Sequence, residues 1–146
     1  MNHKIILLVE DNPDDELLTL RALKQNNIMN DVIVVRDGQQ ALDYFFDENA
    51  STRSIPALIL LDLKLPKIDG LEVLRHIRAD PRTKVQPVVI LTSSKEEQDI
   101  ITSYRRGSHS YIRKPGNFDQ FLEAIRQLGL YWLVLNEPPI EHGEQS

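Results

Sequence analysis

The chain has 146 residues, a formal net charge of −5 at pH 7, a hydrophobic fraction of 41% and no cysteine. This length suits one domain with its own core, and the acidic balance argues against a protein that binds nucleic-acid backbones. The lack of cysteine excludes disulfides and thiolate zinc sites and is typical of a reducing compartment, so we expect a cytoplasmic protein. The longest apolar run, Leu130 to Leu135, is far shorter than the roughly 20 residues of a membrane-spanning helix, and we expect no membrane span.

Five short runs rich in β-branched residues and leucine predict strands. They are continuous rather than alternating in hydrophobicity, which is typical of strands covered on both faces, as in a parallel sheet. The runs are Ile5 to Val9, Val32 to Val35, Ala57 to Leu61, Val88 to Leu91 and, more weakly, Ser110 to Ile112.

Between these runs, apolar residues recur at spacings of three and four, which predicts amphipathic helices. The first helix is expected to begin at Pro13, with Asn12 as its cap and acids in its first turn. Strand and helix alternate five times, which favours an α/β doubly wound parallel sheet with helices on both faces. The apolar positions of the helices are Leu17, Leu18, Leu20 and Leu23; Ala41, Leu42 and Phe45; Leu71, Val73, Leu74 and Ile77; Ile100, Ile101 and Tyr104; and Phe118, Phe121, Leu122, Ile125 and Leu128.

The expected organisation is one domain over residues 1–135, whose last helix continues past Leu128, followed by a flexible tail over residues 136–146. A surface loop is predicted from Asp47 to Pro56. Ser94 with Glu97, and Asn117 with Gln120, have the spacing of capping boxes at two helix starts.

Polar side chains follow the predicted strands at the edge where parallel sheets bind ligands. They are Glu10 and Asp11 after the first strand, Asp62 after the third, Thr92 and Ser93 after the fourth, and Lys114 and Pro115 after the fifth. Three neighbouring carboxylates repel one another unless they share a cation, and oxygen ligands favour a hard ion such as Mg²⁺. A nearby Thr and Lys would hold the oxygens of an incoming anion, so the set predicts phosphoryl transfer onto a carboxylate.

Each of these residues has a simpler interpretation when taken alone. An acid directly after a strand is commonly a turn or cap residue, Thr92 a strand-end hydroxyl bonded to the backbone, and Lys114 a solvated charge. Tyr111 on a weak strand is more often a packing residue. It is the joint occurrence at the ends of four strands that favours a functional site.

With these residues in view, residues 4 to 128 resemble the receiver domain of bacterial two-component response regulators, the CheY-like fold with strand order 2-1-3-4-5. The motifs that carry the likeness are Ile5 to Asn12, Leu60 to Pro66 with Asp69-Gly70, Ile90 to Ser93, and Ser110 to Pro115.

The resemblance implies that Asp62 is the phosphoacceptor for a histidine kinase, and that the chain is a phosphorylation switch rather than a turnover enzyme. Asp11, Asp62 and the backbone carbonyl of Lys64 would bind Mg²⁺, with Mn²⁺ as a substitute, and Glu10 would act largely through water. The remaining implied roles are phosphoryl contacts for Thr92 and Lys114, a rotamer switch for Tyr111 with Thr92, and a cis peptide between Lys114 and Pro115.

The whole chain is similar to the stand-alone regulators that partner phytochrome-type histidine kinases. The likeness rests on Asp43 to Phe46, the loop to Pro56 and the extension from Leu130 to Pro139. Lys64 and Gly116 depart from that subgroup, which more often has Asn and an apolar residue at these positions. The departure at Lys64 leaves the phosphoryl lifetime open.

The extension presents apolar side chains all round if it is helical, which is typical of an interface. We therefore expect a homodimer, and the alternative is a segment folded back on its own domain. The candidate interface residues are Tyr104, Leu130, Tyr131, Trp132, Val134 and Leu135.

Two other functions are possible on the sequence. A Mg²⁺-dependent phosphatase would also use an aspartate nucleophile, but it would need a general acid where Lys64 stands. A degenerate receiver acting as a constitutive scaffold would not need the full set of acids, Thr92 and Lys114. No segment resembles a DNA-binding module, so the expected output is a changed protein–protein interaction.

Overall fold

The described strands form one parallel sheet. The computed structural model describes residues 5–92, 110–113 and 118–129. The sheet order is β2-β1-β3-β4-β5 and every neighbouring pair is parallel, which confirms the predicted doubly wound topology. The strands are β1 (Ile6–Val9), β2 (Val32–Val35), β3 (Leu58–Leu61), β4 (Val88–Thr92) and β5 (Ser110–Arg113), each within one residue of the predicted bounds.

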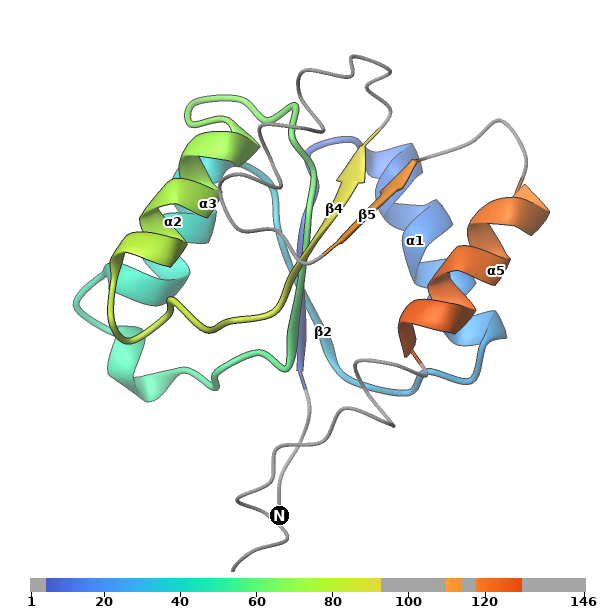
Figure 1. Cartoon of the computed structure of the whole chain (residues 1–146), viewed down its shortest axis with the longest axis horizontal. Coiled ribbons are helices and arrows are strands. Elements are labelled where there is room, and N and C mark those ends of the chain that lie inside the picture. Colours follow the sequence, from blue (N-terminus) through green and yellow to red (C-terminus); the bar gives the residue numbers. More distant parts are fainter. Residues whose placement is uncertain (1–4, 93–109, 114–117, 130–146) are drawn as a thin grey trace, which may run out of the picture.

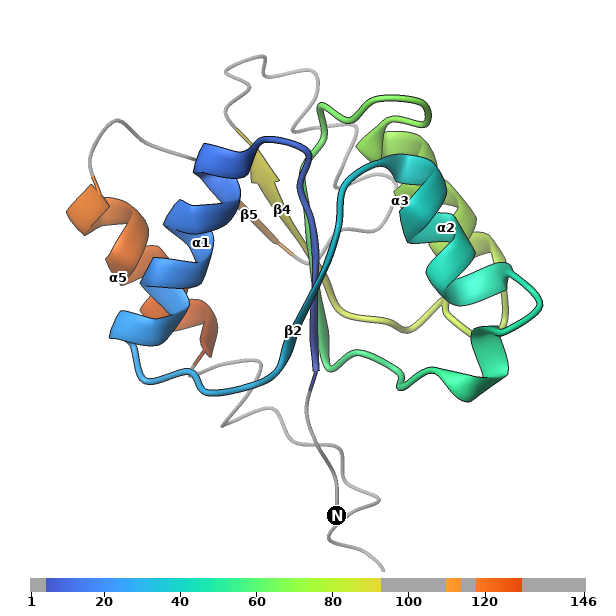
Figure 2. The same cartoon turned by 180° about the vertical axis from the view of Figure 1, so that it is seen from behind.

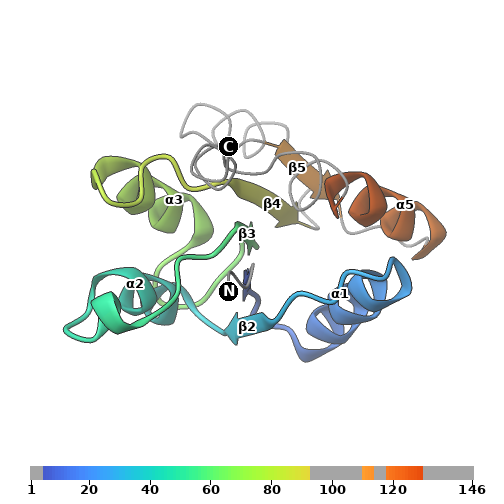
Figure 3. The same ribbon diagram turned by 90° about the horizontal axis from the view of Figure 1, so that it is seen from below.

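Helices cover both faces of the sheet (Figure 1). One layer holds α1 and α5 and the other holds α2 and α3, as the reverse view in Figure 2 and the view from below in Figure 3 also show. The helices are α1 (Pro13–Gln25), α2 (Gly38–Phe46), α3 (Gly70–Ala79) and α5 (Phe118–Gly129), with a short 3₁₀ turn, η1 (Ala50–Thr52), inside the predicted surface loop. The predicted helix around Ile100 and Tyr104 and the capping pairs that include Ser94 and Asn117 lie outside the described residues.

The sheet separates two apolar cores, because alternate side chains of each strand point to opposite faces. Leu7 and Ile59 pack with α2 and α3, whereas Leu8 and Leu60 pack with α1 and α5. Every residue of β1 and β3 is at most 1% exposed. Burial of each such side chain contributes about 1.5–3 kcal/mol, so the central strands hold the sheet edge in place.

Two expectations of burial were wrong. All four residues of β2 are only half-buried, because β2 is an edge strand with a single neighbour. Leu17 is 62% exposed although it was placed in the apolar stripe of α1. The buried face of α1 is centred on Thr19, Ala22 and Leu23, and at 100° per residue Leu17 lies on the opposite side of the helix.

The ends of α1 are fixed by two asparagines. The Asn12 side-chain oxygen accepts hydrogen bonds from the Asp14 and Asp15 amides at 2.8 and 3.1 Å, which confirms the predicted cap. At the other end, the Asn26 side-chain amide donates to the carbonyls of Ala22 and Leu122, both at 3.0 Å. One side chain thus ties α1 to α5.

Among the described helices, none has the length and hydrophobicity to cross a bilayer.

Candidate functional site

Backbone hydrogen bonds fix Glu10 and Asp62 at the carboxyl edge of the sheet. The Glu10 amide donates to the carbonyl of Val35 at 3.0 Å, and the Asp62 amide donates to the carbonyl of Val9 at 3.1 Å. These bonds continue the parallel ladders one residue past the strands. Both carboxylates therefore start from adjacent positions, directly after the two fully buried strands β1 and β3.

Three carboxylates meet at this edge, as the sequence predicted. One oxygen each of Glu10, Asp11 and Asp62 lies within 4.8 Å of the other two. Glu10 is fully buried, Asp62 is 6% exposed and Asp11 is exposed. Mutual repulsion and desolvation disfavour three charged acids at such a spacing, and a shared divalent cation removes both costs. The donor set consists only of oxygens and fits a hard ion such as Mg²⁺.

Two backbone amides orient the buried acids. The Asn12 amide donates to Glu10 Oε2 at 3.3 Å, and the Lys64 amide donates to Asp62 Oδ1 at 3.2 Å. The buried acids are thus positioned by the chain that follows each of them.

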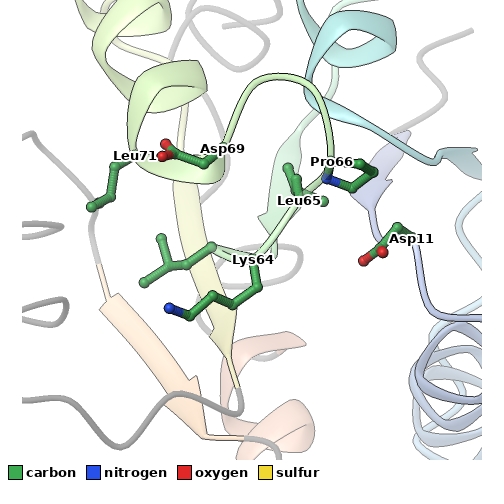
Figure 4. Close-up of a pocket in the computed structure, with 7 residues that line it drawn as sticks. Asp11, Lys64, Leu65, Pro66, Asp69 and Leu71 are labelled. Atoms are coloured by element: carbon green, nitrogen blue, oxygen red, sulfur yellow. The ribbon is translucent and has the colours of Figure 1, made fainter.

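A cavity of about 390 Å³ opens beside the acids. Figure 4 shows Asp11 on the β1 side, Asp69 and Leu71 on the α3 side, and the segment from Lys64 to Pro66 between them. The Lys64 side chain extends away from Asp11 in this view. The cavity gives a phosphoryl-sized group access to the exposed side of the cluster.

The loop after β3 is held by two close backbone approaches that the sequence analysis did not single out. A Cβ on Gly38 would lie 1.8 Å from the carbonyl oxygen of Ile68, and one on Gly70 would lie 2.3 Å from the carbonyl oxygen of Asp62. No side chain fits either place. Each glycine directly follows an aspartate that caps its helix, Asp37 for α2 and Asp69 for α3, and this repeated Asp-Gly pair is the signal that could have found them.

An ion pair also holds the loop after β3. Lys67 lies in the left-handed region with φ 68°, and its ammonium is 3.5 Å from the Asp37 carboxylate, which is itself mostly buried. The cap and the first residue of α2, Asp37 and Gly38, therefore contact the loop that carries Lys64. This arrangement fixes the backbone on which the predicted Lys64 carbonyl ligand lies.

The other predicted site residues are only partly described. Thr92 ends β4, opposite Arg113, and so its backbone lies at the same carboxyl edge. Tyr111 pairs with Ile90 within the sheet. The side chains of Thr92 and Tyr111, and the whole of Lys114 and Pro115 with the predicted cis peptide, lie outside the described part of the structure. The same holds for the interface candidates Tyr104, Leu130, Tyr131, Trp132, Val134 and Leu135.

Comparisons with known proteins identify this combination of fold and acids. The response regulator receiver domain family matches residues 6–126. The chain belongs to this family. It is a receiver-domain response regulator of two-component signalling, which confirms the resemblance found in the sequence, and proteins of this family partner with histidine kinases.

Several similar proteins are phytochrome-associated regulators that consist of little more than this domain. Rcp1 of Synechocystis sp. is 40% identical over 131 residues, which are 89% of each chain. The phosphorylated cyanobacterial phytochrome response regulator RcpA superimposes with a TM-score of 0.84 at 41% identity, over 94% of this chain and 99% of that one. The bacteriophytochrome response regulator RtBRR gives 0.75 at 53% identity, over 94% and 85%.

A metal-bound structure exists for one of these relatives. The Mn²⁺-bound form of Rcp1 superimposes with a TM-score of 0.83 at 38% identity, over 93% of this chain and 99% of that one. The acidic cluster of the present chain provides the all-oxygen donor set that such an ion requires.

Proposed function

We propose that Asp62 is the phosphoacceptor of this chain and that Glu10, Asp11, Asp62 and the Lys64 carbonyl hold Mg²⁺, for which Mn²⁺ can substitute. The observation that carries the proposal is the approach of three carboxylate oxygens to within 4.8 Å at the carboxyl edge. When bound, Mg²⁺ offsets the negative charge on the phosphoryl oxygens. The acids of this chain supply its ligands from two adjacent strands.

In the proposed step, a carboxylate oxygen of Asp62 attacks the phosphorus of a kinase phosphohistidine. The new P–O bond forms as the P–N bond breaks, and the departing imidazole takes up a proton. Thr92 and Lys114 contact the phosphoryl oxygens, and Tyr111 changes rotamer with Thr92. The added charge then alters the face that this chain offers to other proteins.

The chain assists its own phosphorylation but is not a turnover enzyme under this proposal. An aspartate-based phosphatase needs an acid to protonate its leaving group, and Lys64 stands where that acid would be. Release of a chromogenic alcohol from a phosphate ester over many turnovers would favour the phosphatase.

Labelling with acetyl phosphate and Mg²⁺ tests the phosphoacceptor. Phosphate-affinity gels are expected to show a shifted band for the wild type and none for Asp62→Asn or after chelation of Mg²⁺. Asp69→Asn is the matched control, because Asp69 lines the same cavity but lies outside the carboxylate cluster, so labelling should persist. A shifted band for Asp62→Asn would contradict the assignment.

For the partner, we propose a bacteriophytochrome-type histidine kinase that phosphorylates this chain in the cytoplasm, where ATP is available to the kinase. Support comes from the phytochrome-associated relatives, which match over almost their full lengths. Phosphotransfer from such a kinase, at least tenfold faster than from an unrelated one, is the expected result.

We further propose a homodimer through the fourth and fifth helices and the extension that includes Trp132. Support comes from the apolar run between Leu130 and Leu135. Sedimentation should show a dimer at micromolar concentration. A monomer that phosphorylation leaves unchanged would contradict this proposal.

A further inference from the structure

A second cavity, the basal cavity, lies at the opposite, amino edge of the sheet. It has a volume of about 310 Å³ and lies between the surface loop before β3 and the loop before β4. The rings of Tyr44 and Phe45 and the side chain of Ile55 give it apolar walls, and Arg53 and Arg82 add two guanidinium groups. No carboxylate is among the described residues that line it.

Both arginines are held in place by an aromatic ring and an aspartate. Arg53 lies 5.7 Å from the Tyr44 ring centroid and pairs with Asp47 at 2.7 Å. Arg82 lies 5.4 Å from the Phe46 ring centroid and donates Nε and Nη2 to the two oxygens of Asp80, both at 3.0 Å. The Nη1 group of Arg82 remains available, and this side chain is 65% exposed. Each guanidinium is thus paired with an aspartate, and the Nη1 group of Arg82 is the donor that the rim offers to a further carboxylate.

Exposed apolar side chains lie on the loops at this edge of the sheet, and one of them, Ile55, lines the cavity. Ile55 is 77% exposed and Val85 is 78% exposed. Their loops are joined because the Gln86 side-chain amide donates to the carbonyl of Pro56. Met29, which is 77% exposed, precedes β2 at the same edge, so large apolar side chains are exposed on the loops before three of the strands. Exposed apolar surface of this kind marks a contact region.

The segment 136–146 of the same chain has matching chemistry. It carries Glu137, Glu141 and Glu144 around the apolar sequence Pro138-Pro139-Ile140, and it contains no lysine or arginine. An aliphatic side chain between carboxylates is the complement of an apolar cavity with two guanidinium groups on its rim. Two prolines also limit the conformations that binding must freeze.

The segment can reach the cavity. α5 ends at Gly129, where an added Cβ would contact the Ile28 side chain in the loop before β2, so the chain leaves α5 at the amino edge. If residues 130–135 continue the helix and residues 136–140 are extended, the chain spans about 26 Å from Gly129 to Ile140. A compact domain of this size has a radius of gyration of about 15 Å, so this reach is longer than the radius of the molecule. Tethering also gives the segment a high effective concentration near the cavity.

We propose that Glu137 to Glu141 docks in the basal cavity of its own chain. Ile140 occupies the apolar space between Tyr44 and Ile55, and the flanking glutamates face Arg53 and Arg82. This docking does not depend on phosphorylation of Asp62.

NMR relaxation of the full ¹⁵N-labelled chain tests the proposal. Residues 137–141 are expected to move with the domain, and Ile140→Ser is expected to release them and to shift the amide resonances of Ser54 and Ile55. Arg82→Glu should lower the ratio of docked to free segment by about two- to fivefold, which is the usual strength of an exposed charged pair. The double variant Arg82→Glu with Glu141→Arg should restore the ratio to within about a factor of two.

Arg75→Glu is the matched control, because Arg75 is also an exposed arginine paired with a neighbouring acid but lies outside the basal cavity. It should leave the docked fraction unchanged. The docked fraction should also be the same at low and high protein concentration. Free motion of residues 137–141 in the wild type, or docking that rises with concentration as expected for a second copy, would overturn the proposal.

Discussion

The two edges of one sheet carry opposite chemistry. At the carboxyl edge, Glu10, Asp11 and Asp62 gather within 4.8 Å. At the amino edge, Arg53 and Arg82 line an apolar cavity. The difference follows from the helix direction in this fold, because each helix begins near the carboxyl edge and ends near the amino edge. Helix N-termini favour anions and C-termini favour cations. At the amino edge, Asp47 and Asp80 end α2 and α3, and each of them pairs with one of these arginines.

Helix termini show the same division in detail. Asp37 and Asp69 cap α2 and α3 by accepting hydrogen bonds from the Gln40 and Glu72 amides at 2.7 and 2.9 Å. At the other end of α2, Arg53 donates to the carbonyls of Asp43 and Tyr44 at 2.9 and 3.2 Å. The same elements thus provide a cluster of carboxylates at one edge and an arginine-lined cavity at the other.

The largest predicted effect is at the carboxyl edge. Gly38→Ala should lower the free energy of unfolding by about 3 kcal/mol, because its Cβ would meet the backbone oxygen of Ile68 at 1.8 Å. Gly129→Ala at the amino edge should stay within about 1 kcal/mol, since its Cβ would meet only the movable end of the Ile28 side chain at 2.6 Å. Urea unfolding measures both, and equal losses would refute the contrast.

Mg²⁺ should stabilise the carboxyl edge almost as strongly. At a hundredfold excess over its Kd, it should raise the free energy of unfolding by about 2.7 kcal/mol. Asp11→Asn should remove most of this gain, because it takes one ligand from the cluster. Thermal unfolding with and without Mg²⁺ measures the effect, and an undiminished gain in Asp11→Asn would show that the ion binds elsewhere.

Removal of Arg53 should weaken the amino edge to a smaller extent. Arg53→Ala should lower Tm by about 5 °C, because the side chain bonds to Asp47, caps the last carbonyls of α2 and lies over Tyr44. Arg75→Ala, which removes only the pair with Glu72, should change Tm by less than about 1 °C. Similar Tm values for the two variants would show that the loop before β3 does not depend on Arg53.

The smallest effect concerns pH at the amino edge. Burial raises the pKa of the Tyr44 hydroxyl above its usual value of 10, although nearby Arg53 lowers it. Its proton also donates to the carbonyl of Ser54 at 2.6 Å. Tyr44→Phe should therefore cost about 1 kcal/mol at neutral pH.

The difference between the wild type and Tyr44→Phe depends on which state ionises first. A raised folded pKa gives stability that is present below pH 10 and is lost as the pH rises through the folded value. The gap between the two proteins should therefore close above pH 10. The free energies of unfolding of both proteins at pH 7 and pH 11 measure this difference. A difference that widens at pH 11 would show that folding lowers the pKa of Tyr44 rather than raising it.

Local patterns predicted most of the fold and the centre of the site. The continuous runs at Leu58 to Leu61 and their neighbours predicted buried parallel strands, and the acids after them predicted the carboxylate cluster. The contact of Gly38 with Ile68, the ion pair of Lys67 with Asp37 and the basal cavity were not predicted. They arise where segments far apart in the chain approach each other, and no periodicity within one segment records such an approach.

The Asn26 side chain has a consequence for the order of assembly. One proton of its amide goes to Ala22, four residues earlier, and the other to Leu122, 96 residues later. When α1 is synthesised, the second N–H of the Asn26 side chain therefore has no protein acceptor yet. Until α5 has been made, it can only donate to water. The hydrogen bond from Asn26 to Leu122 therefore forms only after nearly the whole chain has been made.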